Sequence, residues 1–136
     1  MDPYIKVPPA HYGGIERVVA DLADGLARSG HDVTLWAAPG SRVNGRVDAF
    51  GREGEWTRWS NVRNTLTLAG RFLGRTRFDV IHNFGRLAYL APVLARDVPK
   101  VQTYMRTVNP TNMTTARRMV SSTRCAASAL SPAMRS

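Results

Sequence analysis

The sequence predicts an α/β domain of three layers, in which helices cover both faces of a parallel sheet. A strongly amphipathic helical pattern is followed within a few residues by a short apolar run, and strand-like and helix-like segments then alternate along the chain. A helix between two strands carries the chain back to the edge where it began, so successive strands run parallel with right-handed crossovers. The 136 residues suffice for one domain that buries about two-thirds of its unfolded surface.

The first helix is expected over Gly14–Arg28. Its apolar residues recur at spacings of three and four on one helical face, and they are Ile15, Val18, Val19, Leu22, Ala23 and Leu26. Gly30 follows where a left-handed cap would end the helix. The apolar run Val33–Ala38 comes next and stops at Pro39. Because this run is short and partly β-branched, it predicts a buried strand.

The rest of the chain alternates between shorter helices and strands. Residues 39–60 are rich in glycine, arginine and polar residues, which predicts a long loop with a short strand near Arg46–Phe50. A second helix is expected over Val62–Gly74. One apolar stripe on it comprises Val62, Leu66, Ala69 and Leu73, with Leu68 and Phe72 beside it. The other predicted elements are strands at Phe78–His82, Lys100–Thr103 and Cys125–Ser128, a helix at Leu87–Ala95 interrupted by Pro92, and a basic helix at Thr111–Ser121.

The segment before the first helix is unusual for this fold class. A doubly wound domain opens with an apolar strand before its first glycine-rich turn. Here only Met1–Val7 precedes the Pro8-Pro9 pair, and just Tyr4, Ile5 and Val7 have strand-like side chains. Either this segment is a poor strand or the usual first strand is missing.

Charge is the unusual feature of the composition. The formal net charge is +9, all but two of the 19 basic residues are arginines, and no acidic residue follows Asp97. This balance favours anionic partners, namely nucleic acid, acidic lipid or a phosphorylated ligand, without choosing among them. The stripe on residues 62–74 fits either an anionic membrane surface or a core-facing helix with a solvated basic face. The basic residues beside it are Arg63, Arg71, Arg75 and Arg77.

Cysteine usage and hydropathy limit the class of protein further. Cys125 is the only cysteine, which excludes an internal disulfide framework and a cysteine-rich zinc site. No apolar run reaches the roughly 18 residues of a membrane-spanning helix. The segment Met1–Pro9 lacks the apolar core of a secretory signal. A cytoplasmic location is therefore expected, with the inner face of a membrane as the surface available for peripheral contact.

Tyr12, Gly13 and Gly14 stand directly at the start of the first helix. Glycine lets the backbone approach a ligand, and a helix N-terminus offers unpaired N–H groups and a positive dipole end. The pattern fits a phosphate or carboxylate site, although a Gly-Gly pair before a helix is more often simple turn chemistry. It is neither a GxGxxG dinucleotide fingerprint nor a GxxxxGK[ST] phosphate loop, which weakens nicotinamide and ATP interpretations.

A second group of candidates lies at the predicted strand ends. His82 ends its strand, where open α/β sheets place their ligand crevice. Asn83, Arg86, Tyr104 and Arg106 are expected to line the same polar cleft. The alternative for His82 is an imidazole that is simply hydrogen-bonded at a strand end. No Ser/His/Asp set, metal-ligand cluster or close carboxylate pair occurs, so no metal site is predicted.

Three stretches, in this order and spacing, resemble the N-terminal domain of a retaining GT-B glycosyltransferase of the family-4 type. Residues 7–19 resemble the family's opening loop and first helix, residues 30–35 its Gly-His-x-Val-Thr strand entry, and residues 78–82 its x-Asp-Val-Ile-His strand. The resemblance implies a Rossmann-like domain with a parallel sheet, which forms the acceptor side of a two-domain cleft. The other domain of such enzymes binds a nucleotide-diphosphate sugar.

The resemblance also implies roles for the candidate residues. Gly13 and Gly14, with Tyr12, would approach the donor diphosphate or the acceptor, and His82, Asn83 and Arg86 would lie near the acceptor. Met105 stands where the family often has a histidine, and a thioether cannot exchange protons or hold charge. Arg106 is then the nearby residue that can act electrostatically, and Tyr104 is a candidate for substrate binding. The catalytic candidates are therefore His82 and Arg106. No metal or cofactor is implied beyond the donor substrate, since cationic side chains and helix dipoles can stabilise a leaving diphosphate.

Measured against that family, residues 1–136 are expected to be one domain of a fragment that lacks both the first strand and the nucleotide-sugar-binding domain. Such a fragment is expected to be inactive alone. Its expected partners are a small-molecule or lipid-linked glycan acceptor and a missing second domain or chain. One alternative is a non-catalytic module that binds an acceptor or a partner. The other, a basic nucleic-acid-binding protein, is less favoured because no recognition helix or RNA-binding platform occurs.

Overall fold

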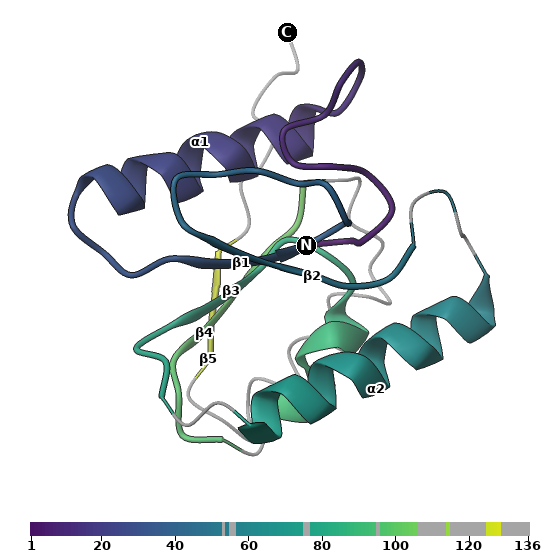
Figure 1. The fold of residues 1–136 in the computed structure, drawn as a ribbon. Helices are drawn as coiled ribbons and strands as arrows, with labels where there is room; N and C mark the ends of the chain where they lie inside the picture. The colour runs from purple at the N-terminus through teal and green to yellow at the C-terminus, as the bar shows by residue number, and fades with distance from the viewer. Residues whose placement is uncertain are drawn as a thin grey trace, which may run out of the picture.

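The helices and strands of the computed structural model follow one another in the predicted order (Figure 1). The structure describes residues 1–52, 54, 57–74, 77–94, 96–105, 114 and 125–128. The elements are α1 (Gly14–Arg28), β1 (Thr34–Ala37), β2 (Arg46–Ala49), α2 (Arg58–Gly74), β3 (Ile81–Asn83), the 3-10 helix η1 (Leu87–Val93), β4 (Lys100–Thr103) and β5 (Cys125–Ser128).

The boundaries confirm most of the predicted elements. α1 and β4 begin and end at the predicted residues, and Gly30 has the left-handed φ of 88° that the predicted cap requires. β3 is displaced along the chain and ends at Asn83. η1 is a 3-10 helix that contains Pro92, which has no N–H to donate. All but one residue of the basic helix predicted at Thr111–Ser121 lies outside the described part of the chain.

The strands run parallel, as predicted, but they form two sheets. β1 pairs with β2, with Leu35 opposite Val47, and β3, β4 and β5 pair in that order. Residues 1–7 form turns and bends, so the described chain has no strand before α1. Both β1 and β3 are therefore edge strands, and the described residues do not build the single central sheet of the predicted three-layer arrangement.

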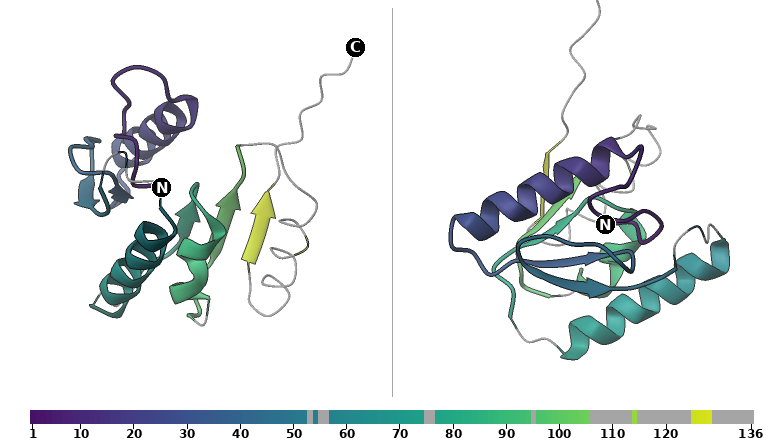
Figure 2. Two further views of the ribbon diagram at one scale, coloured as in Figure 1. Left: turned by 90° about the vertical axis from the view of Figure 1, so that its right-hand side faces the viewer. Right: turned by 45° about the horizontal axis from the view of Figure 1, so that its top comes forward.

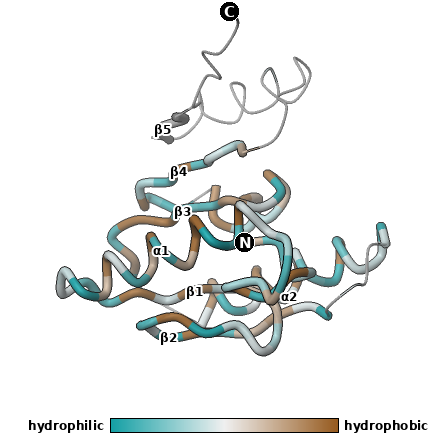
Figure 3. The backbone as a smooth tube through the Cα atoms, turned by 90° about the horizontal axis from the view of Figure 1, so that it is seen from above, coloured by the Kyte–Doolittle hydropathy of each residue, from teal (hydrophilic) through white to brown (hydrophobic). Residues whose placement is uncertain are grey.

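The two sheets lie next to each other with the N-terminus between them. Seen from above, β5, β4 and β3 are followed by the N-terminus and then by β1 and β2 (Figure 3). The left view of Figure 2 also shows the N-terminus between the β1–β2 pair and β3. α1 and α2 lie on opposite sides of the strands (Figures 1 and 2). The arrangement is that of an α/β domain whose sheet is divided at one position.

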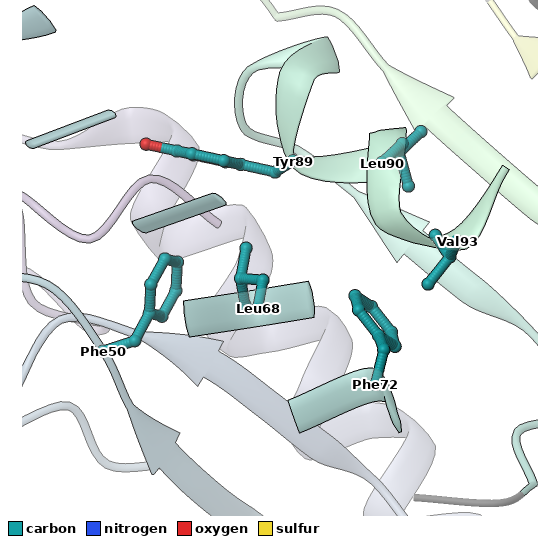
Figure 4. Close-up of a cluster of buried hydrophobic side chains, with 6 residues drawn as sticks. All are labelled: Phe50, Leu68, Phe72, Tyr89, Leu90 and Val93. Atoms are coloured by element: carbon teal, nitrogen blue, oxygen red, sulfur yellow. The ribbon is translucent and has the colours of Figure 1, made fainter. Parts of the chain in front are cut away.

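Two hydrophobic clusters hold the elements together. One joins α1, β1 and the N-terminal segment and consists of Val7, Val19, Ala20, Leu35 and Ala37. The other joins α2 to η1 and to the end of β2. It consists of Phe50, Leu68, Phe72, Tyr89, Leu90 and Val93, shown in Figure 4. The second cluster connects the two sheets, because Trp36 of β1 and Ile81 of β3 both pack against it.

The predicted core faces are only partly confirmed. On α1, Val19 and Ala23 are buried as expected, but Leu22 and Leu26 are 37% and 40% exposed. On α2 the core-facing interpretation of the predicted stripe is wrong. Its members Val62, Leu66 and Leu73 are exposed, and Trp59 extends the same apolar surface. The buried residues of α2 are Ser60, Asn64, Leu68 and Phe72, because that side of the helix faces η1 and the end of β2.

The N-terminal segment is anchored by hydrogen bonds, although it forms no strand. The backbone N–H of Val7 donates to the Ser41 hydroxyl at 2.9 Å, and the N–H of Arg42 donates to the Val7 carbonyl at 2.7 Å. The Tyr4 hydroxyl donates to Oδ1 of Asn61 on α2 at 2.5 Å. The segment therefore connects the α1–β1 half of the fold with α2.

Candidate functional site

The first group of candidate residues lies at the N-terminus of α1. α1 leads through residues 29–33 back into β1, so the start of the helix lies at the edge where the parallel strands end (Figure 1). The first hydrogen bond of the helix runs from the N–H of Arg17 to the carbonyl of Gly13 at 3.1 Å. The N–H groups of residues 14–16 precede that bond and lack helical acceptors. This helix end is suited to an anion.

The two glycines have different surroundings. A Cβ on Gly13 would lie 2.7 Å from Glu16 Oε2 and 2.9 Å from Pro9, whereas a Cβ on Gly14 would have nothing within 4 Å. Gly13 is buried, and packing inside the molecule requires a glycine there. This agrees with the interpretation of the Gly-Gly pair as a turn rather than a ligand site. Gly14 is exposed, and the space above it is open to a ligand.

An arginine of α1 fixes the loop before the helix, and a carboxylate is buried beside it. Glu16 in the first turn is 4% exposed, where its charge complements the positive end of the helix dipole. The Arg17 guanidinium donates through Nη2 to the His11 carbonyl at 3.0 Å. Tyr12 lies in this loop and is 95% exposed. The loop is thus held by α1 while Tyr12 and Gly14 stay accessible.

His82 is the centre of the second group. Its Nε2 lies 2.8 Å from the Thr103 hydroxyl on the adjacent strand β4, and its ring stacks on Phe84 with centroids 4.0 Å apart. His82 as a whole is exposed. Burial, and secondarily the positively charged N-terminus, lower the pKa of His82 below its usual 6.5. At neutral pH the ring is therefore neutral and can either donate or accept a hydrogen bond.

Asn83 is buried beneath the site and supports it through hydrogen bonds. Its Nδ2 donates to Gln102 Oε1 at 2.6 Å and to the Arg86 carbonyl at 3.0 Å, while its Oδ1 accepts from the N–H of Gly85 at 3.1 Å. Asn83 and Gln102 are both buried. Because its amide is used within the protein, Asn83 shapes the loop that presents the exposed Arg86 side chain.

Two residues of this network were missed by the sequence interpretation. Gln102 lies opposite Asn83 in the parallel register, and two long polar residues at matching positions of neighbouring buried strands were a usable signal. Asp2 accepts a hydrogen bond from the N–H of Arg86 at 3.3 Å and packs where a Cβ on Gly85 would lie. No local pattern links Asp2 to a residue more than 80 positions away.

The remaining candidates follow β4. Tyr104 and Met105 are half-buried at the carboxyl end of that strand. Arg106 lies outside the described residues. The structure thus brings His82, Asn83 and Arg86 together around the ends of β3 and β4, while Tyr12 and Gly14 are presented by a separate element at the same edge of the fold.

Two negative findings apply to the described part of the chain. There, no group of three or more histidine, cysteine, aspartate or glutamate side chains could hold a metal ion. Within those same residues, no helix has the length and hydropathy needed to cross a membrane.

Comparison with known families places these features in one context. A family model described as Glycosyltransferase Family 4 matches residues 12–125, which is most of the chain. The chain belongs to glycosyltransferase family 4. No curated protein matches the sequence well enough to serve as a relative.

The family-4 match covers every candidate residue, from Tyr12 at its first position to Arg106. It therefore includes both the helix N-terminus and the ends of β3 and β4. The family-4 model does not extend over residues 1–11, which form the segment that passes between the two sheets and then the loop before α1.

Proposed function

We propose that this chain is the acceptor-side domain of a GT-B glycosyltransferase, which transfers a sugar from a nucleotide-diphosphate donor to an acceptor hydroxyl with retention. The observation that carries the proposal is the family-4 match over residues 12–125. The match coincides with a helix N-terminus that is open at Gly14 and with a polar group around His82 at the same edge of the fold. Such edges are where open α/β folds bind ligands.

In this proposal the N-terminus of α1 faces a phosphate group of the donor or acceptor. Backbone N–H groups and the helix dipole attract an anion there, and the formal net charge of +9 adds a general attraction for anionic ligands. These groups can stabilise a leaving diphosphate electrostatically, as preorganised donors do in other enzymes.

His82 and Arg86 provide the polar groups for the acceptor. A neutral imidazole that is already oriented by Thr103 can hydrogen-bond an acceptor hydroxyl through its other ring nitrogen, because His82 is exposed. Arg86, whose backbone is held by Asn83 and Asp2, adds a positive charge to this part of the fold. Arg106 lies outside the described residues and stays a candidate from the sequence alone. His82 is accordingly the residue we assign to direct contact with the reacting groups.

The proposal also holds that transfer needs a second, nucleotide-sugar-binding domain. The test is to incubate the purified 136-residue chain with a panel of nucleotide-diphosphate sugars and candidate acceptors. We expect no sugar transfer and no donor hydrolysis beyond that in buffer. Turnover above that background would refute the dependence on a second domain. If a two-domain protein built on this chain binds acceptor without transferring sugar, a non-catalytic binding module is the correct function.

The anion site at α1 can be tested separately with inorganic pyrophosphate as the probe. Gly14→Asp adds a negative charge in open space and should weaken pyrophosphate binding roughly fivefold, since a charge at a helix terminus is worth up to about 1 kcal/mol. Gly70→Asp is the matched control, because Gly70 is exposed on α2 and its Cβ would also meet nothing within 4 Å. Calorimetry or amide NMR shifts measure the binding. Equal weakening of pyrophosphate binding by both variants would mean that the anion binds elsewhere.

A further inference from the structure

A cavity separates the two sheets of the molecule. Its volume is about 840 Å³, and both edge strands line it, β1 through Leu35 and Trp36 and β3 through Ile81 and His82. Native protein interiors are close-packed, with few voids larger than a water molecule. Figures 2 and 3 show β1 and β3 on either side of the N-terminus. A space of this size between two strand edges calls for an occupant.

The helices on both sides contribute apolar side chains to the cavity wall, whereas the segments before β1 and β3 contribute polar ones, namely His31, Asp32, Arg77 and Asp79. α1 contributes Leu22 and Leu26, and α2 contributes Leu68 and Phe72. Leu22 and Leu26 are 37% and 40% exposed, although they belong to the amphipathic face predicted to enter the core. Both leucines line the cavity, whereas Val18, which is also exposed on that face, does not. The missing occupant is thus apolar toward both helices.

The free edges of β1 and β3 present backbone groups to the gap. The carbonyls of Val33 and Ala37 accept hydrogen bonds from the β2 side, so Trp36, one step out of phase, points its backbone groups away from β2. Similarly, the N–H of Ile81 donates toward β4 at Pro99, which leaves the backbone of His82 facing the gap. An occupant that satisfies both edges must itself be a β-strand.

The start of the chain already occupies one end of this gap. The Met1 nitrogen donates to the Trp36 carbonyl at 3.2 Å, as the N–H of a neighbouring strand would. On the other side, Asp2 accepts from the N–H of Arg86, just beyond the end of β3. Met1 and Asp2 therefore lie between the carboxyl ends of β1 and β3. Met1 is half-buried, and desolvation of its amino group lowers the pKa of that group from 8.0 to about 6. This environment is unfavourable for a charged amine and of no consequence for an amide.

We propose that the gap is the docking site of one apolar β-strand that is covalently continuous with the Met1 nitrogen and runs parallel to β1 and β3. Its last residue precedes Met1, and its earlier residues run back between Trp36 and His82 toward the opposite edge. A strand of five or six residues, the common length, suffices to cover the three or four residues of each edge strand. The sheet order becomes β2, β1, the docked strand, β3, β4 and β5.

This order is that of a doubly wound sheet, in which the first strand lies between the second and the fourth. The docked strand also has a consequence for the candidate site. It joins the half that carries α1 and Gly14 to the half that carries His82, so the two groups become parts of one rigid sheet. The proposal rests on the gap and its edges, and it holds whether or not the transferase activity is found.

The test compares the 136-residue chain with a version that carries six residues, mainly valine and isoleucine, ahead of Met1. The control extension has the same length with prolines at two positions, which removes N–H donors and cannot pair in a central strand. Hydrogen exchange of the Trp36 and His82 amides, followed by NMR, is the measurement. We expect exchange at both to slow at least roughly tenfold with the apolar extension alone. Exchange equal to that of the proline control would overturn the proposal.

A pair of charge variants tests whether the extension occupies this cavity. Leu22→Arg places a charge in the cavity wall and should abolish the protection of Trp36 and His82. Val18→Arg is the matched control, because Val18 is 43% exposed on the same helix but does not line the cavity. Loss of protection in both variants, or in neither, contradicts the assigned position of the strand.

Two further measurements distinguish other occupants and cover a failure of the extended chain to fold. Protection of the unextended chain by the free peptide, as strong as that from the fused one, would show that the occupant is a separate chain. Protection that rises with protein concentration would identify a second copy. In the unextended chain, the dye anilinonaphthalene sulfonate should bind the open cavity and be lost in Leu22→Arg but not in Val18→Arg. An unextended chain that binds no dye has no open apolar cavity, and the proposal fails.

Discussion

At the residue scale, adjacent positions of one motif have separate roles. Gly13 and Gly14 form one Gly-Gly pair in the sequence, which fits both a turn and an anion site. In the structure the turn interpretation applies to Gly13, whose Cβ would collide with Pro9 and Glu16, and the open position is Gly14. The sequence could not separate them, because the neighbours that distinguish them come from the folded loop.

The two glycines are expected to respond differently to alanine. Gly13→Ala should lower the free energy of unfolding by about 1–3 kcal/mol, the usual cost of overpacking, because the nearest atoms include the Pro9 ring as well as the Glu16 side chain. Gly14→Ala should leave it unchanged or raise it by up to about 1 kcal/mol, since alanine is the better helix former. Urea denaturation of both variants measures the difference. Equal destabilisation would mean that Gly14 is also packed.

Residues at strand ends were predicted as a group, and the structure gives each a different role. His82 was predicted to end its strand and lies one residue before the strand's end at Asn83, because a short apolar run shows a strand end only approximately. That Asn83 is buried and shapes the loop beside Arg86 was not predictable, since it depends on Gln102 across the sheet and on the fold of residues 84–86. The hydropathy pattern of a sequence locates the end of a strand, and tertiary contacts decide which side chains there face solvent.

At the element scale, α2 shows why periodicity alone can choose the wrong face. The helix carries two apolar stripes, and the sequence favoured the one with Leu66 and Leu73. The buried stripe instead includes Ser60 and Asn64, whose polar side chains hid its role. Ser60 accepts a hydrogen bond from the N–H of Thr57 at 3.0 Å, which makes its burial acceptable. Contact of the exposed stripe, and of Arg63 beside it, with an anionic membrane stays a prediction.

Truncating one leucine from each stripe of α2 tests this assignment. Leu68→Ala should destabilise the fold by about 2 kcal/mol or more, because Leu68 is 3% exposed within the cluster of Figure 4. Leu66→Ala should change stability by less than about 0.5 kcal/mol, because Leu66 is 66% exposed. Urea midpoints at constant slope provide the comparison. A larger loss for Leu66 than for Leu68 would show that the helix is rotated relative to the structure described.

At the scale of the whole molecule, the order of elements and the family followed from local patterns and motif spacing. The division of the sheet was indicated only by the weak strand pattern of Met1–Val7. Neither the cavity nor the burial of the Met1 amino group has a local signature, because both depend on the distance between β1 and β3. A shortage of apolar residues before the first glycine-rich turn is the one sequence feature that leads to them.

The buried N-terminus makes stability depend on pH in a defined window. Burial lowers the pKa of the Met1 amino group from 8.0 to about 6, so the unfolded chain binds more protons than the folded chain between these values. Stability must therefore rise as the pH rises from 6 to 8, by on the order of 2–3 kcal/mol in the free energy of unfolding. The lowered pKa of His82 also makes stability rise with pH, and this effect is confined to pH values near and below 6.5.

Acetylating the Met1 nitrogen separates the two groups. The acetylated chain keeps an N–H that can donate to the Trp36 carbonyl but has no charge to bury, so the rise in stability between pH 7 and 8 should disappear. The fall below pH 6.5 should remain and should weaken in His82→Gln. Urea midpoints at pH 5, 6, 7 and 8 and constant ionic strength measure both effects. If the acetylated and free chains show the same rise between pH 7 and 8, the amino group is solvated and does not occupy the end of the gap. In that case the first hydrogen bond of the proposed strand is absent as well.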